Sequence, residues 1–475
     1  MTGKTTAYLG GGMSEPFLQA LFDPRRIILI GASDRALFSA GIARYLLTHG
    51  FADKLTMVNA KGKRVFDRPT FATVAEASAE GPFDLAIIAI PAAEVPAAVD
   101  SLADIGCRLA IVESAGFAEA GPEGAALQHR LLETARKHGV RLLGPNCIGV
   151  IDTHTGFAAT EVQDECMKPG AVALVAQSGV FGSILLDWAP SDNLRLSKAI
   201  TMGNRVDLNE ADFLRYLADD EHTRAVAMYL EGVADGRAFF DAVASCSRRK
   251  PVIVLKGGRT AAGARAIRSH TASLAGADLV FDGALRQAGG IRADSLEHLI
   301  DLARAFAACP TPPGDRVAMI TTSGSQGILA TDAITEAGLP LAELSPWTIE
   351  RIKKIAPDWM TIGNPLDVGP SGLFAEGIQA LLADDNVDAL LIHIAIPWGA
   401  MSQMLQAGMP MESLVGDLDT LREAAARKPV LVSHVGFSEF RRLVQEAFGD
   451  FLTIYPTAER AAAVLAALIN FRKEA

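Results

Sequence analysis

The sequence predicts an α/β protein made of several domains, each built on a parallel sheet. Short apolar runs of five to seven residues recur along the chain, and each ends in small residues before a stretch with helical spacing. Continuous apolar strands that alternate with helices are typical of parallel βαβ units, which are buried on both faces. The length of 475 residues agrees with about three domains at roughly 100–200 residues each.

The first predicted domain covers residues 17–150 and has the strand–helix alternation of a Rossmann-like fold. Its apolar runs are Arg26–Ser33, Leu85–Pro91 and Leu109–Phe117, and it closes at Arg141–Gly149. The segment 92–105 between two of these runs is apolar at helical spacing, as a helix of a βαβ unit requires. Residues 1–16 are polar and rich in glycine, and we expect them to form a flexible tail.

Two further domains are predicted at 160–308 and 316–475. The linker between them, 309–315, carries three prolines in five residues and is the clearest boundary in the chain. The second domain has the runs Ala171–Ala176, Ala225–Glu231 and Pro251–Lys256. The third has the runs Arg316–Gly324, Ala389–Pro397 and Pro429–His434.

These two domains open alike. Residues 171–185 read AVALVAQSGVFGSIL and residues 316–330 read RVAMITTSGSQGILA, at an offset of 145. The identical positions within the turn are the pairs Ser178/Ser323, Gly179/Gly324 and Gly182/Gly327. Because the matches fall on the same strand-to-helix turn, they predict a related pair of flavodoxin-like domains with parallel sheets.

Composition and charge exclude several classes of protein. Hydrophobic residues at 49% and charged residues at 21% are typical of a folded chain, not of a disordered one. The net charge of −11 offers no general attraction for nucleic acid. No apolar run is long enough to span a membrane, and we expect no secretory signal because residues 1–16 lack an apolar core. The five cysteines form no CxxC pair, so we expect neither disulfides nor a metal site, and a cytoplasmic location.

Three strand-to-helix turns have the composition of an anion site, at Gly31–Ser33, Gln177–Gly179 and Ser323–Gly327. Such turns present free backbone N–H groups and the positive end of a helix dipole. They also serve tight geometry and N-capping in any α/β protein, so both interpretations stay open. The first lacks the full GxGxxG spacing of a nicotinamide dehydrogenase. In the second, Ala176 and Val180 replace both glycines of the GxSxG motif of serine hydrolases.

The most unusual segment is 256–276, which leaves an apolar strand and holds no carboxylate before Asp278. Its cations are Lys256, Arg259, Arg265 and Arg268. The many small residues predict a mobile loop that lets a phosphate group come close. His270 lies within it, and a neutral imidazole can accept a phosphoryl group. Glu231, at the end of a strand, is a candidate to orient that ring. The alternative is an acid at a strand end without a role in catalysis.

With these residues in view, the chain resembles the α subunit of ADP-forming (NDP-forming) acyl-CoA synthetases, the acetate–CoA ligase members of the succinyl-CoA synthetase superfamily. The resemblance covers about residues 17–475. Its most specific element is SHTASLAG at 269–276, which is similar to the family's phosphohistidine loop SHTGSLAG, with Ala272 in place of a glycine. Glu231 in YLEG resembles the glutamate that steadies the histidine.

The resemblance implies functional residues in all three domains. The first domain would bind CoA through Gly31, Ala32, Ser33, Pro91, Ser114, Gly116, Phe117, Asn146 and Cys147. Two helix N-termini would bind phosphate and face the phosphohistidine through Ser178, Gly179, Ser323, Gly324 and Ser325. The segments 202–204 and 364–367 also match the family, without a clear role.

The resemblance also implies a reaction and a partner. Acyl-CoA, phosphate and ADP would interconvert with a small carboxylic acid, CoA and ATP through an acyl phosphate and a phosphohistidine at His270. No segment resembles an ATP-grasp domain, so ADP or ATP with Mg²⁺ would bind a partner β subunit, for example in an α2β2 assembly. Two alternatives stay open: a non-catalytic CoA-binding regulatory relative, and an acyltransferase that uses CoA without a nucleotide.

Overall fold

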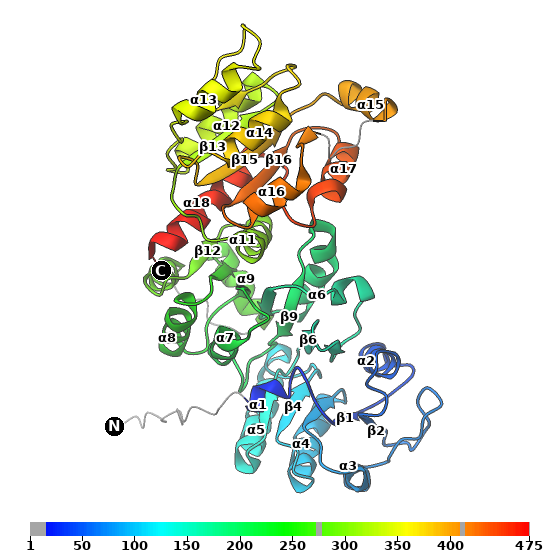
Figure 1. Ribbon diagram of the computed structural model, residues 1–475. Helices are drawn as coiled ribbons and strands as arrows, with labels where there is room; N and C mark the ends of the chain where they lie inside the picture. The colour runs from blue at the N-terminus through cyan, green and yellow to red at the C-terminus, as the bar shows by residue number, and fades with distance from the viewer. Residues whose placement is uncertain (1–15, 272–277, 409–413, 475) are drawn as a thin grey trace, which may run out of the picture.

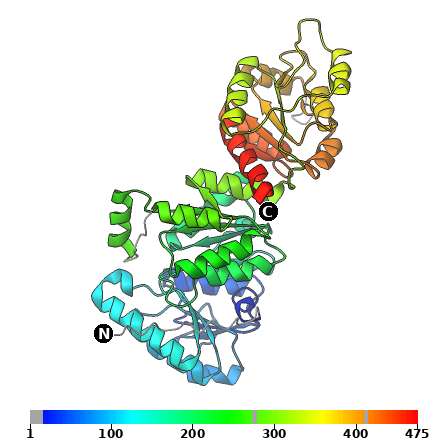
Figure 2. The ribbon, with the colours of Figure 1, turned by 90° about the vertical axis from the view of Figure 1, so that its left-hand side faces the viewer.

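The computed structural model describes residues 16–271, 278–408 and 414–474, and it confirms the α/β prediction. Three mainly parallel sheets with flanking helices follow one another along the molecule, with the first domain at one end and the third at the other (Figure 1 and Figure 2). Residues 1–15 of the predicted tail lie outside the described residues, and the predicted domain boundaries stay predictions. None of the helices described is long and apolar enough to cross a membrane.

The first sheet has the strand order β2-β1-β3-β4-β5, and all its pairs are parallel. Phe71 continues the sheet beyond β2 by an isolated parallel bridge to Val58. With Phe71 in the place of a further strand, the order matches that of a Rossmann fold. The strands are β1 (Ile27–Ile30), β2 (Leu55–Val58), β3 (Leu85–Ile88), β4 (Leu109–Val112) and β5 (Arg141–Leu143). The helices are α1 (Pro16–Gln19), α2 (Leu37–Thr48), α3 (Val74–Ala77), α4 (Val95–Asp104) and α5 (Pro122–His138).

The second sheet has the order β12-β11-β10-β8-β9-β6-β7. Strands β8 to β12 are parallel in the flavodoxin-like order 2-1-3-4-5. The strands are β6 (Val150–Asp152), β7 (Phe157–Ala158), β8 (Val172–Ala176), β9 (Leu196–Thr201), β10 (Ala225–Leu230), β11 (Val252–Lys256) and β12 (Ile291–Ala293). The helices are α6 (Gly179–Trp188), α7 (Glu210–Asp219), α8 (Gly236–Ser247), α9 (Ala261–Thr271), α10 (Asp278–Gln287) and α11 (Leu296–Ala308).

One feature of the second sheet differs from the purely parallel prediction. Strands β6 and β7 form an antiparallel hairpin on the β9 edge. Each has at most three residues, so neither produces the continuous apolar run by which the other strands were predicted.

The third sheet has the order β14-β13-β15-β16-β17, again 2-1-3-4-5 and parallel throughout. Its strands are β13 (Val317–Thr321), β14 (Leu366–Asp367), β15 (Ala389–Ile394), β16 (Val430–His434) and β17 (Thr453–Tyr455). Its helices are α12 (Gly324–Glu336), α13 (Pro346–Lys353), α14 (Phe374–Leu382), α15 (Trp398–Gln406), α16 (Leu418–Ala425), α17 (Ser438–Phe448) and α18 (Ala458–Glu474). The shared order confirms that the second and third domains are both flavodoxin-like.

The first two domains are joined through the backbone. Segment 204–208 of the second domain runs antiparallel to residues 142–145, at the edge of the first sheet. The amides of residues 204, 206 and 208 donate to the carbonyls of residues 145, 144 and 142 at 2.9, 3.0 and 3.1 Å. Arg141 Nε also lies 2.8 Å from Asp207 Oδ2. This junction holds the carboxyl end of the edge strand β5 against the second domain.

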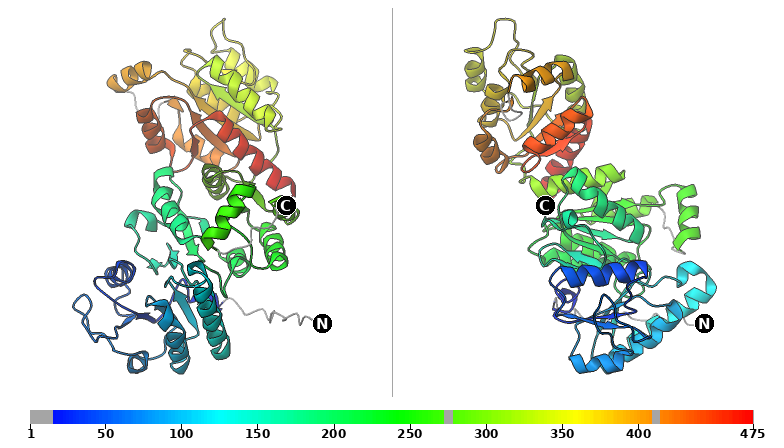
Figure 3. Two further views of the ribbon diagram at one scale, coloured as in Figure 1. Left: turned by 180° about the vertical axis from the view of Figure 1, so that it is seen from behind. Right: turned by 90° about the vertical axis from the view of Figure 1, so that its right-hand side faces the viewer.

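The third domain meets the second through its last helix. Helix α18 packs against α11, and Figure 3 shows it in red at the junction of the two domains. The buried carboxylate of Asp301 accepts two bonds from Arg460, from Nε at 2.6 Å and from Nη2 at 2.8 Å. Arg304 Nη2 donates to the Ile454 carbonyl at 3.1 Å.

Candidate active site

The turn between β8 and α6 has the geometry of a helix N-cap. Ser178 has an extended backbone, and its Oγ accepts from the Phe181 amide at 3.4 Å. Gly179 is the first helical residue, so the free amides of the first turn and the positive end of the dipole lie here. The Ser178 cap agrees with the N-capping interpretation, and the remaining free amides are also suited to an anion. The binding of phosphate to Ser178 and Gly179 stays a prediction.

Gln177, directly before that turn, joins it to the predicted acid. Gln177 is only 4% exposed, and its backbone amide donates to the Tyr229 carbonyl at 2.9 Å. Gln177 Oε1 accepts from the amides of Glu231 and Gly232 at 2.8 and 3.2 Å. The structure therefore brings Glu231 to the N-terminus of α6. The sequence marks Gln177 as part of a turn, but nothing in the local pattern indicates its bond to Glu231 across 54 residues.

The carboxylate of Glu231 is buried in a tight environment. Tyr229 Oη donates to Glu231 Oε1 at 3.5 Å, and the Tyr229 ring stacks on Phe181 with centroids 3.8 Å apart. Burial, and then the nearby negative charge of Glu231, raise the pKa of Tyr229 to about 12, so the phenol keeps its proton at neutral pH. A Cβ on Gly257 would lie 3.1 Å from Tyr229 Oη. The small residue after β11 therefore leaves room beside the acid.

One of the predicted cations lies inside the protein, not on a surface loop. Lys256 is 2% exposed, and its Nζ donates to the Gly257 carbonyl at 2.6 Å. Burial lowers the pKa of Lys256, and the negative charges of Asp278 and Glu231 oppose that change. Arg259, in contrast, donates from Nη1 to the Asp294 carbonyl at 2.7 Å. Lys256 and Arg259 thus do not form a single exposed patch.

Residues 261–271 of the predicted mobile loop around His270 are helical. Helix α9 covers Ala261–Thr271 and places His270 in its last turn. The loop prediction is wrong over residues 261–271, because the alanines of this segment are also the strongest helix formers. The side chain of His270 and residues 272–277 lie outside the described part of the chain. The contact between Glu231 and His270 therefore stays a prediction.

The corresponding turn of the third domain differs in its electrostatics. Ser323 Oγ lies 3.3 Å from Ser325 Oγ, and Ser323 makes no side-chain cap with α12. A Cβ on Gly324 would lie 2.7 Å from Asp367 Oδ2. A carboxylate so close opposes an anionic ligand, whereas the free amides of α12 favour one. Phosphate binding by Ser323, Gly324 and Ser325 stays a prediction.

The predicted CoA residues lie at the carboxyl edge of the first sheet, where ligands of open α/β sheets bind. At the end of β1, the amides of Gly31 and Ala32 both donate to the Val58 carbonyl at 3.0 Å. Ser33 Oγ accepts from the Ala36 amide at 3.1 Å, just before α2. The turn is therefore built by its own bonds, which leave fewer free donors than the sequence suggested.

The ends of β3 and β4 are tied by Ser114. Its Oγ donates to the Ile90 carbonyl at 2.6 Å and lies 3.2 Å from the Ile90 amide, next to Pro91. The Asn146 amide donates to the Ser114 carbonyl at 3.0 Å. The structure thus brings Pro91, Ser114 and Asn146 together at one edge.

The neighbouring turn at Gly116 and Phe117 faces a carboxylate of its own chain. Their amides donate to Glu119 Oε1 at 2.6 and 3.1 Å. The thiol of Cys147 is buried and lies 3.4 Å from the Val112 carbonyl, and burial raises its pKa well above the usual range. Any contact of Cys147 with CoA would therefore be made by its backbone. No motif in the sequence marks Glu119.

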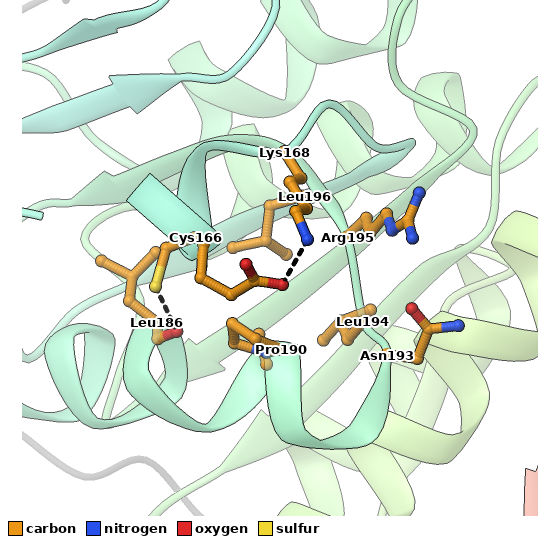
Figure 4. Close-up of a pocket in the computed structure, with 10 residues that line it drawn as sticks. Cys166, Lys168, Leu186, Pro190, Asn193, Leu194, Arg195 and Leu196 are labelled. Carbon is orange, nitrogen blue, oxygen red and sulfur yellow. Dashed lines mark hydrogen bonds and ion pairs between the residues drawn. The ribbon is translucent and has the colours of Figure 1, made fainter. Parts of the chain in front are cut away.

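A small hollow elsewhere in the second domain is separate from these groups. It lies at the amino ends of β8 and β9, where Lys168 Nζ pairs with Glu165 at 2.6 Å and Cys166 Sγ donates to the Leu186 carbonyl at 3.2 Å (Figure 4). This is the sheet edge opposite to Gln177 and Glu231, so the hollow is not part of the candidate site.

Known proteins match this arrangement domain by domain. The CoA binding domain family matches residues 25–153, the succinyl-CoA ligase like flavodoxin domain family matches 169–306, and the ligase-CoA domain family matches 317–475. The α subunit of acetate–CoA ligase [ADP-forming] I from Pyrococcus furiosus is 35% identical over 465 residues, which are 96% of this chain and 98% of the relative. The chain belongs to the family of ADP-forming acetate–CoA ligases.

Other members of this ligase family differ in length. Acetate–CoA ligase [ADP-forming] II from Archaeoglobus fulgidus is 38% identical over 387 residues, which are 79% of this chain but only 57% of that protein. Among solved structures, acetyl-coenzyme A synthetase 1 from Ca. Korarchaeum cryptofilum, in complex with phosphate and ADP, superposes with a TM-score of 0.87. It is 31% identical and covers 96% of this chain and 97% of its own. The fold and family expected from the sequence are thus confirmed.

Proposed function

We propose that this chain is the CoA- and acyl-binding subunit of an ADP-forming acid–thiol ligase. It interconverts acyl-CoA, phosphate and ADP with a carboxylic acid, CoA and ATP. The observation that supports this most directly is the buried Glu231, tied by Gln177 to the N-terminus of α6 in a chain of this family. CoA binds at the carboxyl edge of the first sheet, at the predicted residues Gly31, Ser33, Ser114 and Asn146.

In the thioester-consuming direction, the first step is phosphorolysis. A phosphate oxygen attacks the acyl carbonyl, the carbon–sulfur bond breaks, and the CoA thiolate leaves with the electron pair. The product is an acyl phosphate. The amides at Ser178 and Gly179 stabilise the charge on the phosphate oxygens, and they need no reorganisation because the helix already holds them.

The second step moves the phosphoryl group to the protein. A ring nitrogen of His270 attacks phosphorus, the bond from phosphorus to the acyl oxygen breaks, and the carboxylate leaves. Glu231 accepts a hydrogen bond from the N–H of the other ring nitrogen and stabilises the positive charge on the ring. The phosphohistidine then transfers its group to ADP.

The nucleotide step requires a second subunit. The Pyrococcus furiosus relative, which this chain matches almost end to end, is itself an α subunit. We infer an ATP-grasp β subunit that holds ADP or ATP with Mg²⁺, in an α2β2 assembly. The cytoplasmic location expected from the sequence stays a prediction.

The half-reaction of the single chain tests the proposal. Purified protein is incubated with acetyl-CoA and radiolabelled phosphate, and we expect an acid-labile label on the chain together with free CoA. His270→Ala removes the label. A wild-type chain that takes up no label supports the non-catalytic regulatory relative instead. CoA-dependent acyl transfer that survives in His270→Ala supports the acyltransferase.

A further inference from the structure

The turn at 203–205 in the second domain lies between Glu231 and the predicted CoA turn at Gly116 and Phe117, called the CoA turn below. On one side, Asn204 Nδ2 donates to Glu119 Oε2 at 2.6 Å and to Gln128 Oε1 at 2.8 Å. Glu119 in turn holds the amides of Gly116 and Phe117. Asn204 is therefore linked to the backbone of the predicted CoA turn through the side chain of Glu119.

On the other side, the next residue reaches the segment that follows Glu231. The side chain of Arg205 is 8% exposed, and its Nη1 donates to the Gly232 carbonyl at 2.8 Å and to Glu210 Oε2 at 3.0 Å. Glu210 Oε1 accepts from the Ala234 amide at 2.6 Å. Since Gln177 accepts from the Gly232 amide, Gly232 is held at both its N–H and its carbonyl.

The backbone of this turn has little freedom to move. Gly203 has a φ of +58°, and a Cβ there would collide with the carbonyls of Pro145 and Asn146. The Asn204 amide donates to the Pro145 carbonyl at 2.9 Å. Arg205 has a φ of +54°, which a residue with a side chain adopts only where its surroundings enforce it.

The electrostatics favour the same connection. Burial raises the pKa of Glu119, but the bonds from Asn204, Gly116 and Phe117 outweigh it and hold the pKa below its usual value. Glu119 is therefore an ionised acceptor at neutral pH, and its bonds are charge-assisted.

We propose that Asn204 and Arg205 are positioning residues that hold the CoA turn and the Glu231 segment at a fixed separation. Because this separation is fixed, the acyl phosphate that forms from acyl-CoA is placed where His270 can attack it. This inference rests on the proposed function, since it concerns the delivery between its two steps. Small misplacements of reacting groups can cost about a hundredfold in rate, so a rigid connection has a direct kinetic effect.

For Asn204, two labelling reactions separate positioning from stability. Acetyl-CoA with labelled phosphate requires both the CoA turn and His270, whereas labelled acetyl phosphate reaches His270 without CoA. We expect Asn204→Ala to slow the first reaction by about tenfold or more and the second by less than about threefold. We expect Arg205→Ala, which releases the segment beside Glu231, to slow both reactions by about tenfold.

Asp207→Asn is the matched control. This substitution weakens the ion pair between Arg141 and Asp207, which joins the same two domains through the same segment. The pair contacts neither the CoA turn nor Gly232. We expect a lower Tm with an unchanged ratio of the two labelling rates. Asn204→Asp, which keeps the size of the side chain and places a second negative charge against Glu119, should reproduce the selective loss even if Asn204→Ala does not fold.

Some outcomes would overturn the proposal. Equal loss of both reactions in the Asn204 variants, or a shift of the ratio by Asp207→Asn, would reduce the turn to an interdomain contact. Unchanged labelling in the Asn204 variants would do the same. A wild-type chain that is labelled by neither donor would instead contradict the proposed function itself.

Discussion

The strand-to-helix turns that begin at Gln177 and Thr322 occupy the same place in two domains of the same topology, 145 residues apart. Each uses its side-chain oxygen to accept the amide of the residue that follows the neighbouring strand. Gln177 Oε1 accepts from Glu231 at 2.8 Å, and Thr322 Oγ1 accepts from Ala395 at 3.0 Å. The connection is repeated, but the residue that it holds is an acid in one domain and an alanine in the other.

This difference separates architecture from chemistry. The repeated connection holds the helix N-terminus against the next strand in both domains. Only the second domain places a buried carboxylate at the connected position, where we propose that it orients His270. In the third domain the carboxylate near the turn is Asp367, which comes from the strand on the other side. The comparison therefore predicts that the phosphoryl chemistry depends on the second turn far more than on the equivalent position of the third.

The largest expected effect is at the acid itself. Glu231→Gln should lower the rate of labelling from acetyl-CoA and phosphate by about a hundredfold, because a neutral amide cannot stabilise the charged ring. Ala395→Ser, at the equivalent place in the third domain, should change that rate by less than about twofold. Similar losses in the two variants would contradict the separation of roles.

The ends of the fourth strands allow a pH test. His434, the last residue of β16, corresponds to Lys256 at the end of β11. Burial, with a further contribution from Arg441 and His393, lowers the pKa of His434 to about 4. The unfolded chain binds a proton below about pH 6.5, whereas the folded chain does not until about pH 4, so stability falls across that window as pH decreases.

The free energy of unfolding is expected to fall by about 3 kcal/mol at most between pH 6.5 and 4 because of His434. Denaturant unfolding of wild type and His434→Gln at several pH values measures it. The variant should show a flatter dependence over this window. An equally steep curve for the variant would assign the acid sensitivity to other groups.

The connecting side chains should differ in what they contribute. Gln177→Ala leaves two buried amides without an acceptor and should lower the free energy of unfolding by about 2 kcal/mol, together with slower labelling. Thr322→Ala leaves one amide and should cost about 1 kcal/mol with labelling unchanged. The order of the two losses, measured by denaturant unfolding, is the test, and the reverse order would show that the two connections are not equivalent.

The smallest effects concern the glycines one turn into each helix. A Cβ on Gly182 would lie 2.6 Å from Thr201 Cγ2, and one on Gly327 would lie 2.9 Å from Thr321 Cγ2. Alanine gains about 1 kcal/mol of helix propensity at either position, which the clash opposes. We expect Gly182→Ala to be destabilised by about 1 kcal/mol and Gly327→Ala by less. Comparison of their Tm values checks whether the helices approach the strands as closely in both domains.

Part of this protein could be predicted from local pattern. The alternation of apolar strands and helices defined the α/β class, and the shared turn identified the two related domains. The segment around His270 shows a limit, since the same small residues suit a loop and a helix, and the structure has helix α9 there. The hairpin β6–β7 was missed because its strands are too short to carry a periodic signal.

The sequence by itself determined the fold class, the family and the candidate residues Glu231 and His270, because these depend on runs and motifs of neighbouring residues. Only the tertiary structure decided that Gln177 holds Glu231 and that Asn204 reaches Glu119 across 85 residues. Such bonds join segments that meet only after the sheets have formed and the two domains have packed. A hydrogen bond between distant side chains leaves no periodic trace in the sequence, so the connection between the two predicted sites became visible only in the folded chain.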